Sequence, residues 1–232
     1  MRLGGLQKMT LLDFPGRVAC TVFTVGCNFR CPFCHNSSLV VTREFPELPQ
    51  DDFFAFLKKR QGLLDGVAIT GGEPLLHPDM PEFLEAIRAL GYAVKLDTNG
   101  AFPDRLELIL RRGLADYVAM DVKNSPEKYE LTAGVAGILP KVEQSVQLLL
   151  SGKTPFEFRT TLVDELHEPE DFAAIGQWIE GAERYFIQGF ADSGDILAGS
   201  DRFHAASPEK AKQCLETVRP FVPNAQLRGI DE

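Results

Sequence analysis

Three cysteines lie within eight positions of one loop, at Cys27, Cys31 and Cys34 in the stretch GCNFRCPFCHN. Clustered thiolates are ligands for transition metals, and an odd total of five cysteines does not suggest a disulfide framework. Structural zinc needs four ligands, but His35 is adjacent to Cys34 and no second cysteine pair follows. A cubane iron–sulfur cluster is therefore the favoured interpretation, because three thiolates leave one iron free to bind something else.

Two glycines and a glutamate follow the next apolar run, in the stretch GGEP at 71–74. Glycines without side chains allow a backbone to approach a ligand closely, and Glu73 is an acceptor suited to an ammonium group. The stretch is equally compatible with an ordinary loop turn. Taken alone, the stretch does not decide between a ligand-binding loop and a turn.

Two aspartates, Asp97 and Asp121, end the two apolar runs that come next. Carboxylates at one edge of a sheet repel each other unless a cation or a donor lies between them. Lys123 would supply that charge, as would a bound monovalent or divalent cation to which Thr98 adds its hydroxyl. Helix capping and a solvated surface lysine are the ordinary alternatives. Arg159 lies in the run that follows.

These side chains need a scaffold that brings strand ends together, and apolar strand-like runs alternate with amphipathic helix-like runs along the chain. Strands are expected at 17–25, 66–70, 93–98, 117–123, 156–163 and 185–190, with a short seventh at 225–229. Helices are expected at 50–61, 79–90, 103–112, 137–151, 168–180 and 207–219. Parallel strands end at the same edge, so the polar groups would meet there. A closed eight-unit barrel typically needs about 250 residues. We therefore expect an α/β fold, a partial, open TIM-type barrel of about six βα units with parallel strands.

Composition limits the class of protein. The chain has 232 residues, a net charge of −9 and 25% charged residues, which is ordinary for one globular domain spanning 1–232. The acidic charge argues against nucleic-acid or anionic-lipid partners. No apolar run is long enough to cross a membrane, and the N-terminus lacks the features of a secretory signal. We expect a cytoplasmic protein whose thiols stay reduced.

Together these motifs resemble a known family. The spacing Cys27-x3-Cys31-x2-Cys34, with Phe33 before the last cysteine, is similar to the signature of radical S-adenosylmethionine (SAM) enzymes. GGEP is similar to their motif for the SAM amine. The stretches DFPGRVACTVFTVGCNFRCPFCHN, GGEPLL, KLDTNG and DYVAMDVKNSPEKY resemble the glycyl-radical-enzyme activating enzymes. The similarity is greatest to activating proteins of anaerobic ribonucleoside-triphosphate reductase and covers roughly residues 7–190.

The resemblance implies a [4Fe–4S] cluster on the three cysteines, whose free iron would chelate the methionine part of SAM. Phe33 would lie beside the adenine, and Gly72 and Glu73 would contact the SAM ammonium. Asp97 and Lys123 would also face the methionine part. Arg159 would supply a further contact, because the stretch FIQGF offers no histidine where related activating enzymes place one against SAM.

The resemblance also implies a cation site and a protein substrate. Asp97, Thr98 and Asp121 match the cation site described for some activating enzymes. Asp13, in the stretch DFPG, would lie near the glycine loop of a partner enzyme. No ferredoxin-like insertion with extra cysteines follows the first motif, so we expect a single cluster.

The implied reaction is reductive cleavage of SAM to methionine and a 5′-deoxyadenosyl radical, which then takes a hydrogen from a glycine Cα. We expect the partner to be an anaerobic ribonucleotide reductase and the electron donor to be a flavodoxin or ferredoxin. Two alternatives stay open. One is a radical SAM enzyme that acts on a small molecule or peptide, and the other is a non-catalytic zinc-binding interaction domain.

Overall fold

The fold is seen in a computed structural model that describes residues 1–41, 46–192 and 194–230. The strands are β1 (Leu3–Thr10), β2 (Ala19–Thr24), β3 (Gly66–Gly71), β4 (Ala93–Thr98), β5 (Tyr117–Asp121), β6 (Phe156–Leu162), β7 (Tyr185–Gly189) and β8 (Gln226–Arg228). The helices are α1 (Ser37–Val41), α2 (Gln50–Arg60), the 3-10 helix η1 (Pro74–Leu76), α3 (Met80–Ala89), α4 (Pro103–Arg111), α5 (Tyr129–Ala133), α6 (Leu139–Ser151), α7 (Pro169–Trp178) and α8 (Pro208–Val218).

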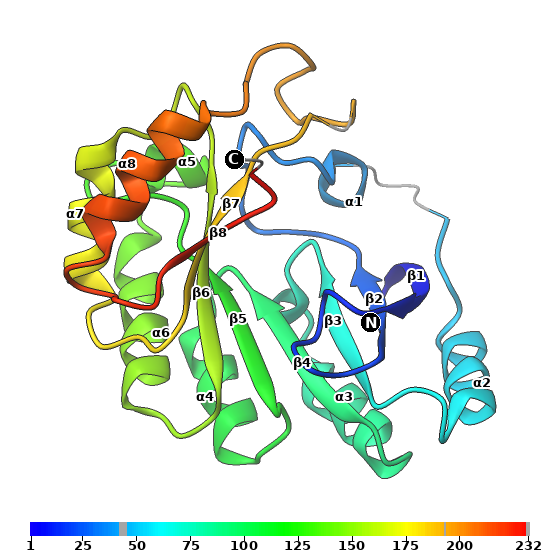
Figure 1. Cartoon of the computed structure of the whole chain (residues 1–232). Coiled ribbons are helices and arrows are strands. Elements are labelled where there is room, and N and C mark those ends of the chain that lie inside the picture. The colour runs from blue at the N-terminus through cyan, green and yellow to red at the C-terminus, as the bar shows by residue number, and fades with distance from the viewer. Residues whose placement is uncertain (42–45, 193, 231–232) are drawn as a thin grey trace.

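The strands form one sheet whose order follows the chain from β1 to β8. β1 pairs antiparallel with β2, and every later pair of neighbours is parallel. Within the described residues the two edge strands, β1 and β8, do not pair, so the barrel is open on that side (Figure 1). The α/β fold and the open, partial barrel expected from the sequence are thereby confirmed.

The sequence pattern does not predict the antiparallel strand β1. Gly4 and Gly5 weaken its strand propensity, and the exposed run 7–9 interrupts the alternation of buried and exposed side chains. The strand forms because its backbone pairs with that of β2, with Leu3 opposite Thr24 and Thr10 opposite Ala19. β1 thus covers the edge that β2 would otherwise leave unpaired.

The two faces of the sheet differ because successive side chains of a strand point to opposite sides. Outward side chains such as Val22 and Ile69 are fully buried in the large core shared with the helices. Inward side chains at the amino ends, Ala19 and Tyr117, pack with Phe14 from the β1–β2 connection in a small second cluster. Phe14 therefore closes the floor of the barrel, and the polar residues lie above it.

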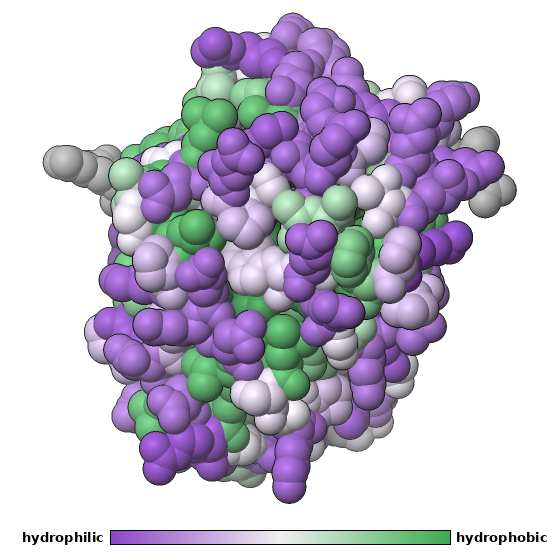
Figure 2. Space-filling model, turned by 90° about the vertical axis from the view of Figure 1, so that its left-hand side faces the viewer, coloured by the Kyte–Doolittle hydropathy of each residue, from purple (hydrophilic) through white to green (hydrophobic). Residues whose placement is uncertain are grey.

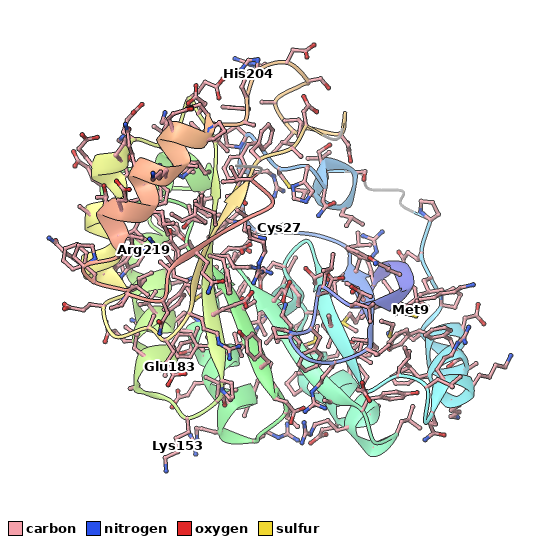
Figure 3. All side chains as sticks on the ribbon, in the orientation of Figure 1. Met9, Cys27, Lys153, Glu183, His204 and Arg219 are labelled. Carbon is pink, nitrogen blue, oxygen red and sulfur yellow. The ribbon has the colours of Figure 1, made fainter. Side chains whose placement is uncertain are left out.

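The cysteine loop and the amino ends of the strands lie at opposite edges of the sheet. Figure 3 shows Cys27, which follows β2, far above Lys153 and Glu183, which precede β6 and β7. The surface on the side of α7 and α8 is mainly hydrophilic, with hydrophobic residues in small areas (Figure 2). No helix in the described part of the chain is both long and apolar enough to cross a membrane.

Candidate active site

A cavity of about 260 Å³ opens at the carboxyl ends of the parallel strands. The loops after β2 and β3 and the ends of β4, β5, β6 and β7 all contribute to its wall. The predicted site residues in this wall are Cys27, Cys31, Phe33, Cys34, Gly72, Glu73, Asp97, Thr98, Asp121, Lys123 and Arg159. The structure thus brings every predicted site residue except Asp13 to one cavity.

The cysteine loop is held by segments that follow β5 and β7. The Arg30 amide donates to the Ala133 carbonyl at 2.9 Å, and the Leu197 amide donates to the Cys34 carbonyl at 3.0 Å. Cys31 is buried, and its Sγ lies 3.8 Å from the same Ala133 carbonyl oxygen. Backbone contacts from distant parts of the chain therefore fix the position of the thiols.

The thiols are in surroundings that favour their protonated form in the free protein. Burial raises the pKa of Cys27 to about 12 and that of Cys31 to about 11. Binding of a metal group must therefore displace their protons. Two donors face the Cys27 sulfur, the Phe29 amide at 3.3 Å and Asn99 Nδ2 at 3.7 Å. Such donors stabilise a thiolate that ligates a cluster.

The donor set fits a three-thiolate iron–sulfur cluster. In a cubane cluster each thiolate binds a different iron, so the three sulfurs need to surround a volume and not a point. Among the residues that the structure describes, no three His, Cys, Asp or Glu side chains converge closely enough to hold one metal ion. A structural zinc needs such convergence. In the part of the chain that the structure describes, the three thiols are thus not gathered around a single point.

The GGEP stretch packs directly against the start of the cysteine loop. The Gly72 amide donates to the Thr24 carbonyl at 2.9 Å, and the Glu73 amide donates to the Gly26 carbonyl at 2.8 Å. A Cβ added at Gly72 would lie 2.0 Å from the Gly26 carbonyl oxygen, which is an impossible contact. The close approach that requires glycine is therefore between two loops of the protein itself.

We expect Gly72→Ala to push the cysteine loop out of place and so to reduce cluster assembly, although it removes no ligand. Iron per chain after anaerobic reconstitution measures this. Gly5→Ala is the matched control, because a Cβ there would meet only a Phe23 ring carbon at an ordinary 3.9 Å. Full iron content in Gly72→Ala would contradict the packing argument.

Glu73 is completely buried and joins the loops after β3 and β4. Its Oε1 accepts from the Leu75 amide at 3.0 Å and from Thr98 Oγ1 at 2.8 Å, and its Oε2 accepts from the Asn99 amide at 2.7 Å. Burial nevertheless raises the pKa of Glu73 to about 7. A carboxylate has about four acceptor positions, so one position is left for the ammonium group of a ligand.

Five charged side chains alternate in sign across the ends of β4, β5 and β6. Asp97 accepts from Lys95 and, at 3.1 Å, from Arg159 Nη1. Asp121 accepts from Arg159 Nε at 2.9 Å and from Lys123 Nζ at 3.0 Å. Burial opposes ionisation of both carboxyl groups, but these cations hold the pKa values of Asp97 and Asp121 below their ordinary range.

The three residues predicted to bind a cation are all engaged by the protein. Asp97 and Asp121 have the partners just described, and the Thr98 hydroxyl donates to Glu73. Thr98 points away from Asp97 because adjacent residues of a strand face opposite sides. The cation site stays a prediction, and Arg159 lies between the two carboxylates.

The motifs do not specify where two further residues lie. Asp13 does not line the cavity, and its Oδ2 accepts a hydrogen bond from Thr21 Oγ1 at 2.5 Å beside the middle of β2. Asn99 lines the cavity and contacts both Cys27 Sγ and Asn28 Oδ1, yet no motif assigns it a role. Its position directly after Asp97 and Thr98 is the signal that could have identified it.

Comparisons with known proteins show which family the chain resembles. Residues 21–168 match the model of the radical SAM superfamily. A proposed glycyl-radical enzyme activating enzyme of Methanocaldococcus jannaschii is 30% identical over 238 residues, which cover 99% of this chain and 96% of that protein. The pyruvate formate-lyase-activating enzyme of Listeria monocytogenes is 28% identical over 193 residues, which cover 77% of this chain and 76% of that protein.

Solved structures show the same fold at low sequence identity. Streptococcus suis SuiB bound to S-adenosylmethionine superposes with a TM-score of 0.70 at 13% identity, over 89% of this chain and 49% of SuiB. The protein anSMEcpe with bound S-adenosylmethionine gives a TM-score of 0.64 at 18% identity, over 85% of this chain and 58% of its own. The chain thus spans about half the length of SuiB, and the shared part is the open barrel.

Proposed function

We propose, since this chain belongs to the radical SAM superfamily, that it activates a partner enzyme by generating a glycyl radical on it. The observation that carries the proposal is the common cavity, in which three thiols face the charged ends of β3 to β6. The relative from Methanocaldococcus jannaschii, similar over almost the whole of both chains, supports the activating role.

The superfamily uses a [4Fe–4S] cluster and SAM, and the reduced cluster supplies the electron that cleaves SAM to methionine and a 5′-deoxyadenosyl radical. The protein binds and orients these groups. Cys27, Cys31 and Cys34 would hold the cluster, and the Glu73 carboxylate would accept from the SAM ammonium. Phe33, buried in the cavity wall, would pack beside the adenine.

The SAM carboxylate needs donors, and the cavity offers them at Lys123 and Arg159. The Lys123 ammonium lies 3.0 Å from one Asp121 oxygen, and its other N–H groups remain available to a ligand. Burial alone would lower the pKa of Lys123, but Asp121 and Cys31 raise it above its ordinary value. Lys123 therefore stays charged and would donate hydrogen bonds to an anionic group such as the SAM carboxylate.

The partner we propose is an anaerobic ribonucleotide reductase, with a flavodoxin or ferredoxin as electron donor and the cytoplasm as the reducing compartment. A protein substrate fits a barrel that is open between β1 and β8. Leu11 and Leu12, which precede Asp13, are 67% and 88% exposed. Exposed large apolar side chains that adjoin one another are typical of protein contact surfaces.

The test is anaerobic incubation of the reconstituted, reduced protein with SAM and the reductase. We expect a persistent electron paramagnetic resonance doublet on the reductase, together with 5′-deoxyadenosine. SAM cleavage with no radical on any glycyl-radical enzyme of the same organism would instead favour a small-molecule or peptide substrate. If the cluster is intact and reducible but SAM is never cleaved, the proposal that this protein is an enzyme would be contradicted.

The raised pKa of Glu73 gives SAM binding a pH dependence. With a pKa of about 7 the free protein carries a proton on Glu73 at pH 6, and the SAM ammonium favours the ionised form. We expect SAM binding to release a proton at pH 6 and none from Glu73 at pH 8. Affinity should fall as the pH drops below 7, by up to about tenfold per unit.

Calorimetry in buffers of different ionisation enthalpy counts the released protons. In Glu73→Gln the proton release at pH 6 should disappear, and the affinity should be weak at both pH values. Equal proton release in the wild type and in Glu73→Gln would remove Glu73 from this role.

Asp13 should act on the partner and not on SAM. We expect Asp13→Ala to lower the radical yield on the reductase while SAM cleavage without a partner is preserved. Thr21→Val is the matched control, because it removes the hydroxyl that donates to Asp13 and leaves the carboxylate. If Thr21→Val lowers the radical yield equally, Asp13 only holds the β1–β2 connection in place.

A further inference from the structure

Arg159 occupies the space between two carboxylates at the base of the cavity. Its Nε lies 2.9 Å from Asp121 Oδ1 and its Nη1 lies 3.1 Å from Asp97 Oδ2. The arginine side chain is only 13% exposed. The sheet register produces the bridge, since Arg159 is the ladder partner of Asp121 and the Asp97 strand is the next one along.

Two lysines flank the carboxylates from the outer sides, so three cations meet two carboxylates. Lys95 pairs with Asp97, and Lys123 pairs with Asp121. Each carboxylate therefore pairs with one lysine of its own, and both carboxylates pair with Arg159. Burial disfavours charge on Arg159, but Asp121 and Asp97 more than offset this and raise its pKa.

We propose that the Arg159 guanidinium takes the place of an inorganic cation between Asp97 and Asp121, so that SAM binding requires no added alkali or alkaline-earth ion. The inference rests on the proposed use of the cavity for SAM. It departs from the cation site that the motifs imply, because the residues that would ligate the ion already have protein partners.

The bonding needs of an inorganic cation and of a guanidinium support the replacement of the ion by Arg159. A bound ion would need free oxygens from both carboxylates and the Thr98 hydroxyl. Here Arg159 donates to both carboxylates, and Thr98 is hydrogen-bonded to Glu73. A guanidinium has five N–H groups, of which two are used on Asp97 and Asp121. The others can bind the SAM carboxylate, as a bridging ion would.

The first experiment uses the wild-type protein loaded with its cluster. SAM affinity is measured by calorimetry in potassium, in sodium and in tetramethylammonium chloride at equal ionic strength. Tetramethylammonium is too large and too poorly coordinating to enter a carboxylate site. We expect the same affinity in all three salts. A loss of about tenfold or more in tetramethylammonium would overturn the proposal without any variant.

The second experiment removes the guanidinium. We expect Arg159→Ala to bind SAM at least about tenfold more weakly in tetramethylammonium chloride. Potassium, sodium or guanidinium, the last well below denaturing concentrations, should restore much of the affinity by entering the space left behind. Arg184→Ala is the matched control, because Arg184 contacts Tyr117 at the amino end of the sheet and does not line the cavity.

These outcomes separate the inference from the proposed function. In Arg159→Ala, a SAM affinity in tetramethylammonium equal to that of the wild type would overturn the role of Arg159. The absence of rescue by any small cation, despite full iron content in this variant, would also overturn it. Failure of the wild type to bind SAM in any salt would instead contradict the proposed use of the cavity. If Arg159→Ala does not fold, the wild-type salt comparison still decides.

Discussion

Replacing Cys31 with alanine should abolish the cluster and, with it, all reductive cleavage of SAM. In the proposed site three thiolates hold the cluster, so the loss of one would leave two irons of a cubane without a protein ligand. Cys31 also lies deepest of the three, within 3.8 Å of the Ala133 carbonyl oxygen. We expect about four irons per chain in the wild type and almost none in Cys31→Ala.

Iron and sulfide analysis, with the absorbance near 400 nm, measures this loss. Cys214→Ala is the matched control, because Cys214 is also a buried thiol and lies in α8, outside the cavity. It should keep the cluster at some cost in stability. Full iron content in Cys31→Ala would refute the ligand assignment.

Replacing Lys123 with methionine should leave the cluster in place and greatly weaken SAM binding. The change keeps an unbranched side chain as far as Cε and removes the ammonium group that Asp121 holds at the cavity wall. Loss of one buried charged contact costs roughly 2–5 kcal/mol, or about 30-fold to several-thousand-fold in affinity. Asp97→Asn should act in the same direction because it breaks the pairing with Lys95 and Arg159.

The control for Lys123→Met is Lys128→Met, whose ammonium pairs with Asp171 at 2.7 Å outside the cavity. Lys128→Met should bind SAM as the wild type does. Calorimetry on cluster-loaded protein gives both affinities. Unchanged binding in Lys123→Met and in Asp97→Asn would take both residues out of the SAM site.

Strand positions and the edge where the polar residues meet could be predicted from the sequence. The continuous apolar runs of β2 to β7 leave little choice of element, and Asp97 and Asp121 end two of them. Parallel order then places these ends together. β1 could not be predicted, because Gly4 and Gly5 give it no intrinsic preference and only pairing with β2 makes it a strand.

The orientation of side chains within the site was harder to predict. The motif places Thr98 with Asp97 because they are the last two residues of β4, although a strand turns adjacent side chains to opposite faces. In the structure Asp97 faces the cavity cations and Thr98 donates to Glu73. Strand alternation alone would have separated them.

Contacts between distant segments could not be obtained from motifs. The bridge from Arg159 to Asp97 and Asp121 depends on the register of three strands, which a single sequence does not specify. The same holds for Gly72, whose tight contact is with the Gly26 carbonyl oxygen. The motif gave the residue type, and the packing of two loops gave the reason for it.

The most direct test of the central claim follows a hydrogen atom from the partner to SAM. The reductase is prepared with glycine dideuterated at Cα and incubated anaerobically with the reduced protein and SAM. We expect 5′-deoxyadenosine that carries deuterium, in step with the radical formed, and an electron paramagnetic resonance signal without its proton doublet splitting. Unlabelled 5′-deoxyadenosine accompanying the glycyl radical, or labelled partner left without any radical while SAM is cleaved, would contradict direct hydrogen abstraction by this protein.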